Sequence, residues 1–409
     1  MTRALKIAEQ GAADPPLPYG RHAIDESDIA AVTAVLRSGQ LAHGPRVGDF
    51  EQALASAVGA AEAAACSSGT AALHLALAAL DVGPGSVCIA PAVTFLATAT
   101  AARLCGADVV FADVDPASGL MTAETLAEAL RRAPGPVRAV LPVHLGGRIC
   151  DMESIAAAAA DVGAAVVEDA CHALGGVDLD GRGVGACVHS DAAVFSFHPV
   201  KTIAAGEGGA VLTNDPGRAA RVRRLANHAV TKDPALICDG ELSLDEAGGL
   251  NPWSYEQIEL GLNYRMNEME AALGLSQLSR LALFVRRRRA LSSLYDLALE
   301  PLSPAVRIVR GRPGDRPAPH LLQVLIDFDR LGVGRGEVMR RLKAESVGSQ
   351  VHYIPVYRQP YFRARYGEQR LDGAERFYRQ VLALPLFPAM RDEDVARCCA
   401  ALARALELA

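Results

Sequence analysis

Short apolar runs alternate with alanine-rich stretches between residues 51 and 215, and this alternation is the clearest pattern along the chain. The apolar runs have the length of β-strands, whereas the alanine-rich stretches have the length and composition of helices. A chain that repeats this order builds a mostly parallel sheet with helices on both faces, which is an α/β fold. Six strands are predicted, at Val87–Ala90, Asp108–Ala112, Val137–Val143, Ala164–Glu168, Ala192–Ser196 and Ala210–Thr213.

The segments on either side of this region are predicted to be more helical. Asp25 is followed by acidic residues and by an apolar set at helical spacing, so a helix is expected to begin there. Its predicted apolar face is formed by Ile29, Val32, Val35 and Leu36. Downstream of a polar stretch, residues Tyr255–Leu283 are predicted to be helical, and Arg286–Arg289 are expected on the solvated side of a long connecting helix.

The C-terminal third is predicted to form a second, smaller α+β domain. It contains a candidate strand at Leu321–Phe328 and candidate helices near Val338–Glu345 and Glu375–Leu382. The expected division places an N-terminal segment and a large domain in residues 1–285 and the small domain in residues 286–409.

Composition narrows the class of protein. Of the 409 residues, 50% are hydrophobic and 22% are charged, which excludes a disordered chain. The net charge of −6 does not favour nucleic acid as a partner. The longest uncharged run, Val82–Ala102, is interrupted by glycine and proline, so no membrane span is expected. The nine scattered cysteines lack the spacing of a zinc site and indicate reduced thiols, no bound metal and a cytoplasmic location.

Lys201 is the first candidate for chemistry. It follows the predicted strand Ala192–Ser196 closely and precedes the glycine-rich turn Gly206–Gly209. An amine desolvated at the end of a buried strand has a lowered pKa and can form a Schiff base. Taken alone, a lysine is more often an exposed loop residue, so its neighbours decide between the two interpretations.

Two neighbouring features favour the chemical interpretation. The buried strand Ala164–Glu168 is followed by Asp169, which places carboxylates at the edge where α/β sheets bind ligands. Such a carboxylate can keep the pyridine nitrogen of pyridoxal phosphate protonated. In addition, Ser67–Thr70 opens a predicted helix, and an uncapped helix N-terminus with glycine and hydroxyl residues binds phosphate. A simple N-cap is an equally good interpretation of that segment.

In this order, the motifs resemble a known family. The five segments are Gly69–Leu73, Pro91–Phe95, Glu168–His172, Ser196–Lys201 and Gly261–Arg265. Together they are similar to the pyridoxal-phosphate-dependent nucleotide-sugar aminotransferases of the DegT/DnrJ type, and the resemblance extends from about Tyr19 to Pro388. It implies an aspartate aminotransferase-like fold and a homodimer with shared active sites.

The resemblance also implies a role for each matching residue. Lys201 and Asp169 are the implied catalytic residues: Lys201 forms the Schiff base and moves the proton, and Asp169 pairs with the pyridinium nitrogen. His172 is expected near the ring hydroxyl and Phe95 on the ring face. The phosphate is expected to be bound by Gly69, Thr70 and Ser196, with Asn263 reaching the phosphate of the neighbouring subunit.

One branch of the family is more similar than the others. Tyr19–Arg21, Gly44–Val47, the Ser-Phe-His-Pro-Val-Lys form of the lysine motif and Pro252–Gln257 resemble the transaminase of pseudaminic acid biosynthesis, which makes UDP-4-amino-4,6-dideoxy-N-acetyl-β-L-altrosamine. This implies amination at the 4-keto carbon of a UDP-linked 2-acetamido-2,6-dideoxy-hexos-4-ulose, with glutamate as donor. Arg21, Tyr255, His352 and Tyr353 are the candidate substrate contacts. The segment around residues 237–249 and the extension before Pro18 depart from the pattern.

Several alternatives stay open at this point. The substrate could be another nucleotide keto-sugar, linked to dTDP or GDP and aminated at C3 or C4. Relatives that dehydrate deoxysugars have histidine in place of the lysine, so Lys201 argues against that chemistry. A non-catalytic regulatory protein on the same fold is disfavoured by the complete set of Lys201, Asp169 and Ser196. For His198, packing behind the lysine is favoured over a role in catalysis.

Overall fold

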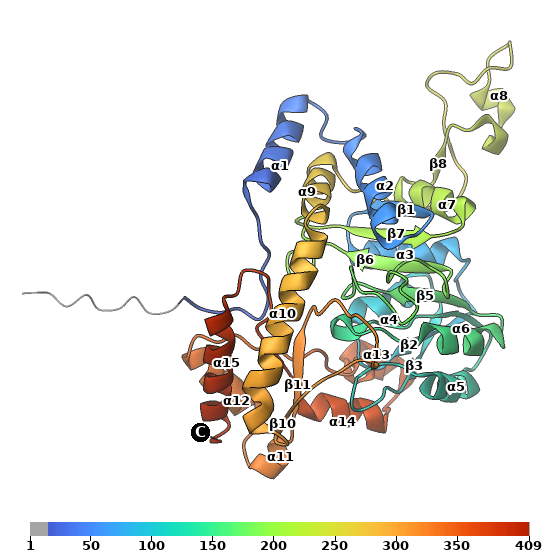
Figure 1. The fold of residues 1–409 in the computed structure, drawn as a ribbon. Helices are drawn as coiled ribbons and strands as arrows, with labels where there is room; N and C mark the ends of the chain where they lie inside the picture. Colours follow the sequence, from blue (N-terminus) through green and yellow to red (C-terminus); the bar gives the residue numbers. More distant parts are fainter. Residues whose placement is uncertain (1–14, 409) are drawn as a thin grey trace, which may run out of the picture.

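A seven-stranded sheet forms the centre of the molecule, whose computed structural model describes residues 15–408 (Figure 1). The strand order is β1-β7-β6-β5-β4-β2-β3, and only β7 runs antiparallel to its neighbours. The strands are β1 (Glu62–Cys66), β2 (Val87–Pro91), β3 (Asp108–Ala112), β4 (Val137–Val140), β5 (Ala165–Asp169), β6 (Ala192–Ser196) and β7 (Gly209–Thr213). The prediction of a mostly parallel α/β sheet is confirmed.

The six predicted strands all form, with small shifts of their ends. β4 ends at Val140, and Val143 makes only an isolated bridge to Asp169, which is the last residue of β5. The seventh strand, β1, was not predicted. Its sequence is rich in alanine, which resembles helix filler, and it becomes a strand because all five of its residues pair with β7.

Helices cover both faces of this sheet. They are α2 (Arg46–Val58), α3 (Gly69–Ala79), α4 (Leu96–Leu104), α5 (Ala123–Arg132), α6 (Met152–Ala160) and α7 (Pro216–Ala226), with the short 3₁₀ helix η1 (Leu145–Gly147), whereas α1 (Glu26–Ser38) lies apart from the sheet. α1 begins with the expected capping box of Asp25 and Asp28. Its apolar face differs from the prediction, because Ile29 and Leu36 are exposed and only Val35 is buried. The cause is position: α1 packs mainly on α9 and lies outside the body of the sheet.

An arm projects from the end of α7, at the upper right of Figure 1. It contains β8 (Val230–Thr231), the 3₁₀ helix η2 (Pro234–Leu236), α8 (Gly240–Ser243) and β9 (Glu256–Gln257). The segment 237–249, which the sequence did not place, forms the outer part of this arm. The predicted helix Tyr255–Leu283 is therefore wrong at its start, because β9 pairs with β8 and the capping box of Asn267 and Glu270 begins the helix later.

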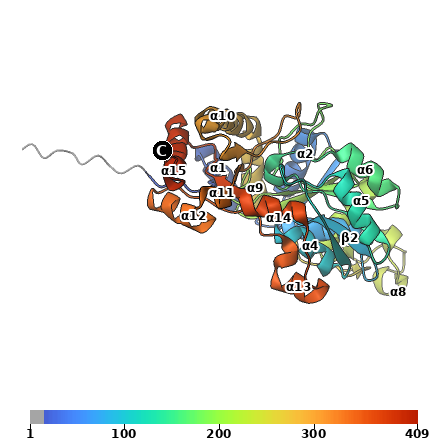
Figure 2. The same cartoon turned by 90° about the horizontal axis from the view of Figure 1, so that it is seen from below.

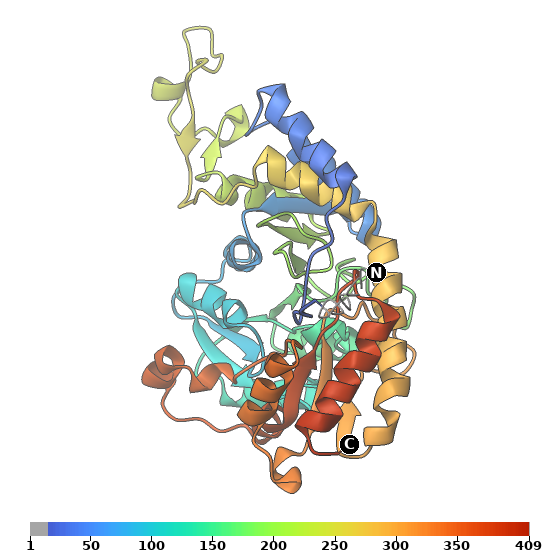
Figure 3. The same ribbon diagram turned by 90° about the vertical axis from the view of Figure 1, so that its left-hand side faces the viewer.

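Two consecutive helices link the body to the C-terminal unit. They are α9 (Glu268–Leu278) and the 19-residue α10 (Leu281–Leu299), after which η3 (Glu300–Leu302) follows. α10 lies beside α15 (Figure 3). The expectation that Arg286–Arg289 are solvated is wrong for Arg288, which is only 1% exposed. Its guanidinium donates to the carbonyls of His320 and Leu386, because α10 is covered on that side by the C-terminal unit.

The C-terminal unit has a three-stranded antiparallel sheet of β10 (Val306–Ile308), β11 (Leu322–Ile326) and β12 (Val381–Leu384). Its helices are α11 (Phe328–Leu331), α12 (Arg335–Ala344), α13 (Pro360–Tyr366), α14 (Asp372–Gln380) and α15 (Asp392–Ala405), with η4 (Val356–Arg358). The predicted strand and both predicted helices are found, although residues 381 and 382 belong to β12. From below, α14 lies between α12 and α15 on one side and α5 and α6 on the other (Figure 2).

One apolar cluster of this unit joins Leu17 to side chains from Leu291 to Leu406. The main-chain N–H of Leu17 donates to the carbonyl of Ser346, so the beginning of the described chain is part of the C-terminal unit. The division at residue 285 falls within α10 and stays a prediction. Among residues 15–408, no helix is both long and apolar enough to cross a membrane.

Candidate active site

A cavity of about 590 Å³ opens at the carboxyl end of β5, between the large sheet and the C-terminal unit. Nine of the predicted site residues line it, namely Gly69, Thr70, Phe95, Asp169, His172, Ser196, Lys201, His352 and Tyr353. They come from segments that are more than 280 residues apart in the chain. The structure therefore brings most of the predicted site together.

The N-terminus of α3 forms one wall. Its Ser68 side chain accepts a hydrogen bond from the N–H of Ala71 at 3.1 Å, so the helix is capped, in contrast to the expectation of an uncapped end. The N–H groups of Gly69 and Thr70 have no hydrogen-bond partner among the described residues. A Cβ atom on Gly69 would lie 2.8 Å from Cβ of Ser196, so glycine is needed for this close approach. Free N–H groups beside a serine hydroxyl fit a phosphate group.

Asp169 ends β5 and presents its carboxylate to the cavity. Oδ2 accepts a hydrogen bond from Oγ1 of Thr98 at 2.7 Å, and Oδ1 accepts one from the N–H of Cys171 at 3.2 Å. Thr98 in turn lies 2.8 Å from the hydroxyl of Thr94. These bonds fix the orientation of the carboxylate. Sequence reasoning missed Thr98, because its bond to Asp169 joins positions that are 71 residues apart in the chain.

Lys201 lies in a turn that follows β6, and the N–H of Lys201 donates to the carbonyl of His198. Burial lowers the pKa of the Lys201 amine below its ordinary value, while the negative charge of Asp169 opposes this shift. The chain has four lysines, at positions 6, 201, 232 and 343. Of the three that the structure describes, only Lys201 lines the cavity. A buried amine of lowered pKa is the nucleophile that Schiff-base formation requires.

His172 is held in one tautomer. Its Nδ1 accepts the N–H of Gly146 at 3.2 Å, so the ring proton is on Nε2, which lies 3.4 Å from the hydroxyl of Tyr353. Burial and the nearby positive charges of Lys201 and Arg148 hold the pKa of His172 well below its ordinary value. The side chain is therefore a neutral hydrogen-bond donor.

Aromatic side chains surround the mouth of the cavity. The ring of Phe95, 54% exposed, lies 5.8 Å from that of Tyr353. The His352 ring is 5.5 Å from the ring of Tyr19, and burial together with Lys201 lowers the pKa of His352 to about 4. His198 is exposed and also lines the cavity, so the interpretation of His198 as packing behind the lysine is wrong.

Three predicted site residues lie away from this cavity within one chain. Arg21 is exposed and Tyr255, on the arm, is 61% exposed. Asn263 makes an isolated backbone bridge to Asn227, below the arm. Conversely, the sequence did not single out Glu207, Gln350 or Gln359, which line the cavity but lie in loops with no distinctive spacing.

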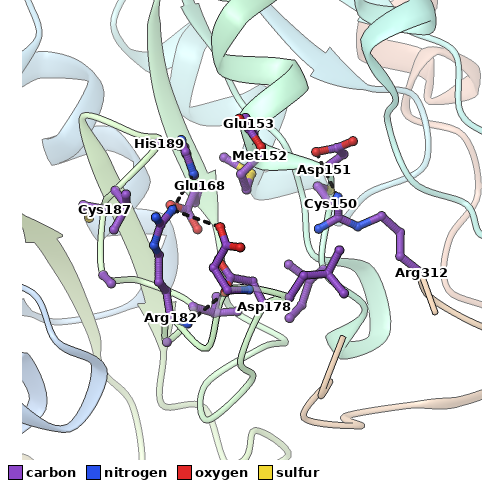
Figure 4. A pocket seen from close by; sticks show the side chains of 17 residues that line it. Cys150, Asp151, Met152, Glu153, Glu168, Asp178, Arg182, Cys187, His189 and Arg312 are labelled. Carbon is purple, nitrogen blue, oxygen red and sulfur yellow. Dashed lines mark hydrogen bonds and ion pairs between the residues drawn. The ribbon is translucent and has the colours of Figure 1, made fainter. Parts of the chain in front are cut away.

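A second, smaller cavity of about 100 Å³ lies behind β5 (Figure 4). It is lined by Glu168, whose carboxylate lies 3.0 Å from Nε2 of His144 and accepts a hydrogen bond of 2.5 Å from the hydroxyl of Ser190. Arg182 bonds His189 at 2.9 Å in the same cavity. Among residues 15–408, no group of three His, Cys, Asp or Glu side chains is placed to hold a metal ion.

The sequence matches the model of the DegT/DnrJ/EryC1/StrS aminotransferase family over residues 22–403. The chain belongs to this family. It is an aminotransferase that depends on pyridoxal phosphate, and the cavity fits that cofactor: it offers free N–H groups at a helix N-terminus, a carboxylate and a buried amine in one space.

Individual relatives agree with the assignment to this family. The spore coat polysaccharide biosynthesis protein SpsC of Bacillus subtilis (strain 168) is 37% identical over 382 residues, which cover 93% of this chain and 94% of SpsC. Helicobacter pylori PseC, described as an aminotransferase of pseudaminic acid biosynthesis, superposes with a TM-score of 0.85 at 26% identity over 96% of this chain and 99% of PseC. DesI, solved with its TDP-sugar product, gives 0.82 at 33% identity over 96% and 93% of the two chains.

Proposed function

We propose that this aminotransferase moves an amino group from glutamate to the 4-keto carbon of a UDP-linked 2-acetamido-2,6-dideoxy-hexos-4-ulose. The observation that carries the aminotransfer is the shared cavity of Lys201 and Asp169, with free N–H groups at the N-terminus of α3. Pyridoxal phosphate supplies an electron sink and holds the amino group between the two half-reactions.

Each wall of the cavity has a proposed task. The N–H groups of Gly69 and Thr70 and the hydroxyl of Ser196 bind the cofactor phosphate. Asp169, fixed by Thr98, keeps the pyridine nitrogen protonated. Two further contacts complete the cofactor site: His172 donates to the ring hydroxyl, and Phe95 covers a ring face.

Lys201 both anchors the cofactor and moves protons. Its lowered pKa increases the uncharged fraction of the amine relative to an ordinary lysine, which favours nucleophilic attack and proton abstraction. Asp169 lies close enough to influence this amine by its charge, so the same carboxylate acts on both the cofactor ring and the lysine. In the proposal, Lys201 would take a proton from the donor carbon in the first half-reaction and deliver a proton to the acceptor carbon in the second.

The substrate part of the proposal rests on the outer region of the cavity. A nucleotide sugar has no α-carboxylate and glutamate has one, so one space must accept both in turn. His352 and Tyr353 line that space, and Nδ1 of His352 is buried without a hydrogen-bond partner among the described residues, so it is free to bond a substrate oxygen. Tyr19 lies beside it, in the Tyr19–Arg21 segment that resembles the pseudaminic acid branch.

A second subunit completes this site in the proposal. Asn263 and Tyr255 lie away from their own cavity, which agrees with a homodimer in which they reach the cavity of the partner. Trp253 is 74% exposed and Leu260 is 88% exposed on the same part of the chain. Large apolar side chains exposed together are typical of a surface that another protein covers.

Arg21 is proposed to contact the diphosphate, since guanidinium pairs bidentately with phosphate. All nine cysteines are free, which agrees with the proposed cytoplasmic location.

A second candidate substrate is a keto-sugar linked to dTDP. The observation that favours it is DesI, whose structure contains a TDP-sugar product and which is more similar in sequence to this chain than PseC is. The chemistry at Lys201 and Asp169 is the same in both cases. The two candidate substrates would differ only in their contacts with the outer region of the cavity.

The decisive experiment is turnover of the purified protein with glutamate and a panel of UDP-, dTDP- and GDP-linked keto-sugars. We expect a product that carries an amino group at C4 of the UDP sugar, identified by mass and by NMR. Amination at C3, or clear preference for a dTDP or GDP sugar, contradicts the proposed substrate but leaves the aminotransferase assignment intact. Omission of glutamate is the control.

A further inference from the structure

A second histidine lies directly behind His172. The ring centroid of His320 is 4.5 Å from that of His172, with 38° between the ring planes. His320 is 5% exposed and lies two residues before the start of β11, so it belongs to the C-terminal unit. His172 follows β5 in the large sheet. The contact therefore joins the two parts of the molecule under the cofactor cavity.

One residue, Gly146, holds both histidines through its main chain. The N–H of Gly146 donates to Nδ1 of His172 at 3.2 Å, and the carbonyl of Gly146 accepts the N–H of His320 at 3.0 Å. Gly146 has φ of 68°, and a Cβ there would lie 2.8 Å from Arg148 and from Gln323. Only glycine fits this position without strain.

The His320 ring is not fixed by a hydrogen bond of its own. Its Nδ1 is buried and has no partner among residues 15–408, whereas its main-chain carbonyl accepts a hydrogen bond from Arg288. The ring is thus placed by its backbone, and its interaction with His172 is a contact of ring faces. Such aromatic contacts are favourable and fix ring orientation.

The charged and titratable groups near this pair come from several elements. Lys201, Arg148 and His352 act electrostatically on His172, and Arg288 acts on His320. The hydroxyl of Tyr353 faces Nε2 of His172, and Asp169 lies on the adjoining strand end. Burial and the positive charges of Lys201, Arg148 and Arg288 hold the pKa of His172 and of His320 well below the ordinary value, so both rings stay neutral.

We propose that His320 is a positioning residue, whose ring keeps the His172 ring oriented with Nε2–H toward the cofactor. Without this ring, His172 keeps the bond from Gly146 and the long contact of 3.4 Å with the Tyr353 hydroxyl, but one ring face is uncovered and the side chain can turn into the vacated space. The cofactor hydroxyl then loses its donor. The inference rests on the proposed role of His172 and adds to it the residue that maintains the geometry.

The test is the pH dependence of the visible absorbance of the cofactor-loaded enzyme. Loss of a donor to the ionised ring hydroxyl disfavours that ionised form, so the spectral midpoint of His172→Leu is expected to rise by about one pH unit. His320→Ala is expected to raise the midpoint in the same direction. His320→Phe keeps a ring in the same place and is expected to restore the wild-type midpoint.

Leu322→Ala is the matched control. Leu322 is buried in the apolar cluster of the C-terminal unit, two residues from His320, and is not in contact with the cavity. Its truncation is expected to lower the melting temperature without moving the spectral midpoint. This separates a general loss of packing from a loss of His172 orientation.

The outcomes are distinguishable. A midpoint that moves in His172→Leu but not in His320→Ala overturns the role of His320 alone. Equal shifts in His320→Ala and His320→Phe also overturn it, because the ring contact is then not the cause. No shift in His172→Leu contradicts the proposed role of His172, which is part of the proposed function.

Discussion

Glu168 and Asp169 are adjacent in β5, but their side chains lie on opposite sides of the strand end. Glu168, behind the strand, has two hydrogen-bond partners, His144 and Ser190, in a cavity of about 100 Å³. Asp169 faces a cavity of about 590 Å³ with a buried amine and with N–H groups that have no partner within residues 15–408. The comparison shows that the proposed reaction site is on the Asp169 side, where N–H groups are still available to bind a ligand. On the Glu168 side, the carboxylate is already bonded to neighbouring side chains and therefore stabilises the fold.

The largest effect is expected from replacement of Lys201, on the Asp169 side of β5. Lys201→Ala is expected to abolish turnover, because no other described lysine lines the cavity. Reduction of the cofactor-loaded wild type with borohydride should label the peptide that contains Lys201, and the variant should show no label. Lys232→Ala, on the exposed arm, is the matched control and should retain both. Labelling of a different lysine would refute the assignment.

Asp169→Asn is expected to retain the fold and to lose activity by a factor on the order of 10² or more, the scale of a removed electrostatic contact to the reacting group. The measurement is kcat with glutamate as donor, with circular dichroism as the check of folding. Near wild-type rates would contradict the role of Asp169. The position of Glu168 behind the strand argues against its taking over that role.

Mixed subunits test whether a single chain supplies all the residues of the cavity that contains Lys201 and Asp169. Lys201→Ala and Asn263→Ala are each expected to be inactive. A heterodimer of the two has one intact site if Asn263 serves the cavity of the partner, so part of the activity should return on mixing. The control is a differently tagged pair that shows subunit exchange. Exchange without recovery of activity would contradict the shared site.

Glu168→Gln is expected to affect stability rather than chemistry. The change weakens the charge-assisted bonds to His144 and Ser190, which should lower the free energy of unfolding by about 1–3 kcal/mol. Denaturant unfolding gives this value, and kcat should stay near that of the wild type. A large loss of kcat with unchanged stability would show that the two faces of β5 are not functionally distinct.

The smallest expected effect concerns the pH at which the apoprotein takes up the cofactor. Because burial lowers the pKa of Lys201, adduct formation should rise with pH through a midpoint below that of an ordinary lysine. The Asp169 charge opposes this shift, so Asp169→Asn should move the midpoint to still lower pH. The rate of absorbance change after addition of pyridoxal phosphate, measured across pH, provides the midpoint. A midpoint of Asp169→Asn that moves to higher pH would contradict the expected direction of the shift.

The parts of the site that the sequence could predict are those fixed by strand ends and helix starts. Asp169, Lys201 and Gly69 each lie next to an element whose apolar pattern is strong, so their places followed from the alternation of strands and helices. Thr98 and His320 depend on contacts between segments far apart in the chain, which no local pattern reveals. The alanine-rich strand β1 was missed because its structure depends on pairing with β7 rather than on its own composition.

The burial of Leu17 has a consequence for the order in which the protein folds. Leu17 packs in the cluster that also contains Leu406, and its carbonyl accepts the N–H of Gly348. Tyr19, two residues later, lines the cofactor cavity. During synthesis the sheet of the large body can assemble as the chain emerges, since domains fold as units from the N-terminal side. The segment around Leu17 must nevertheless wait for the segment around Leu406, so the cavity becomes complete only after that later segment has left the ribosome.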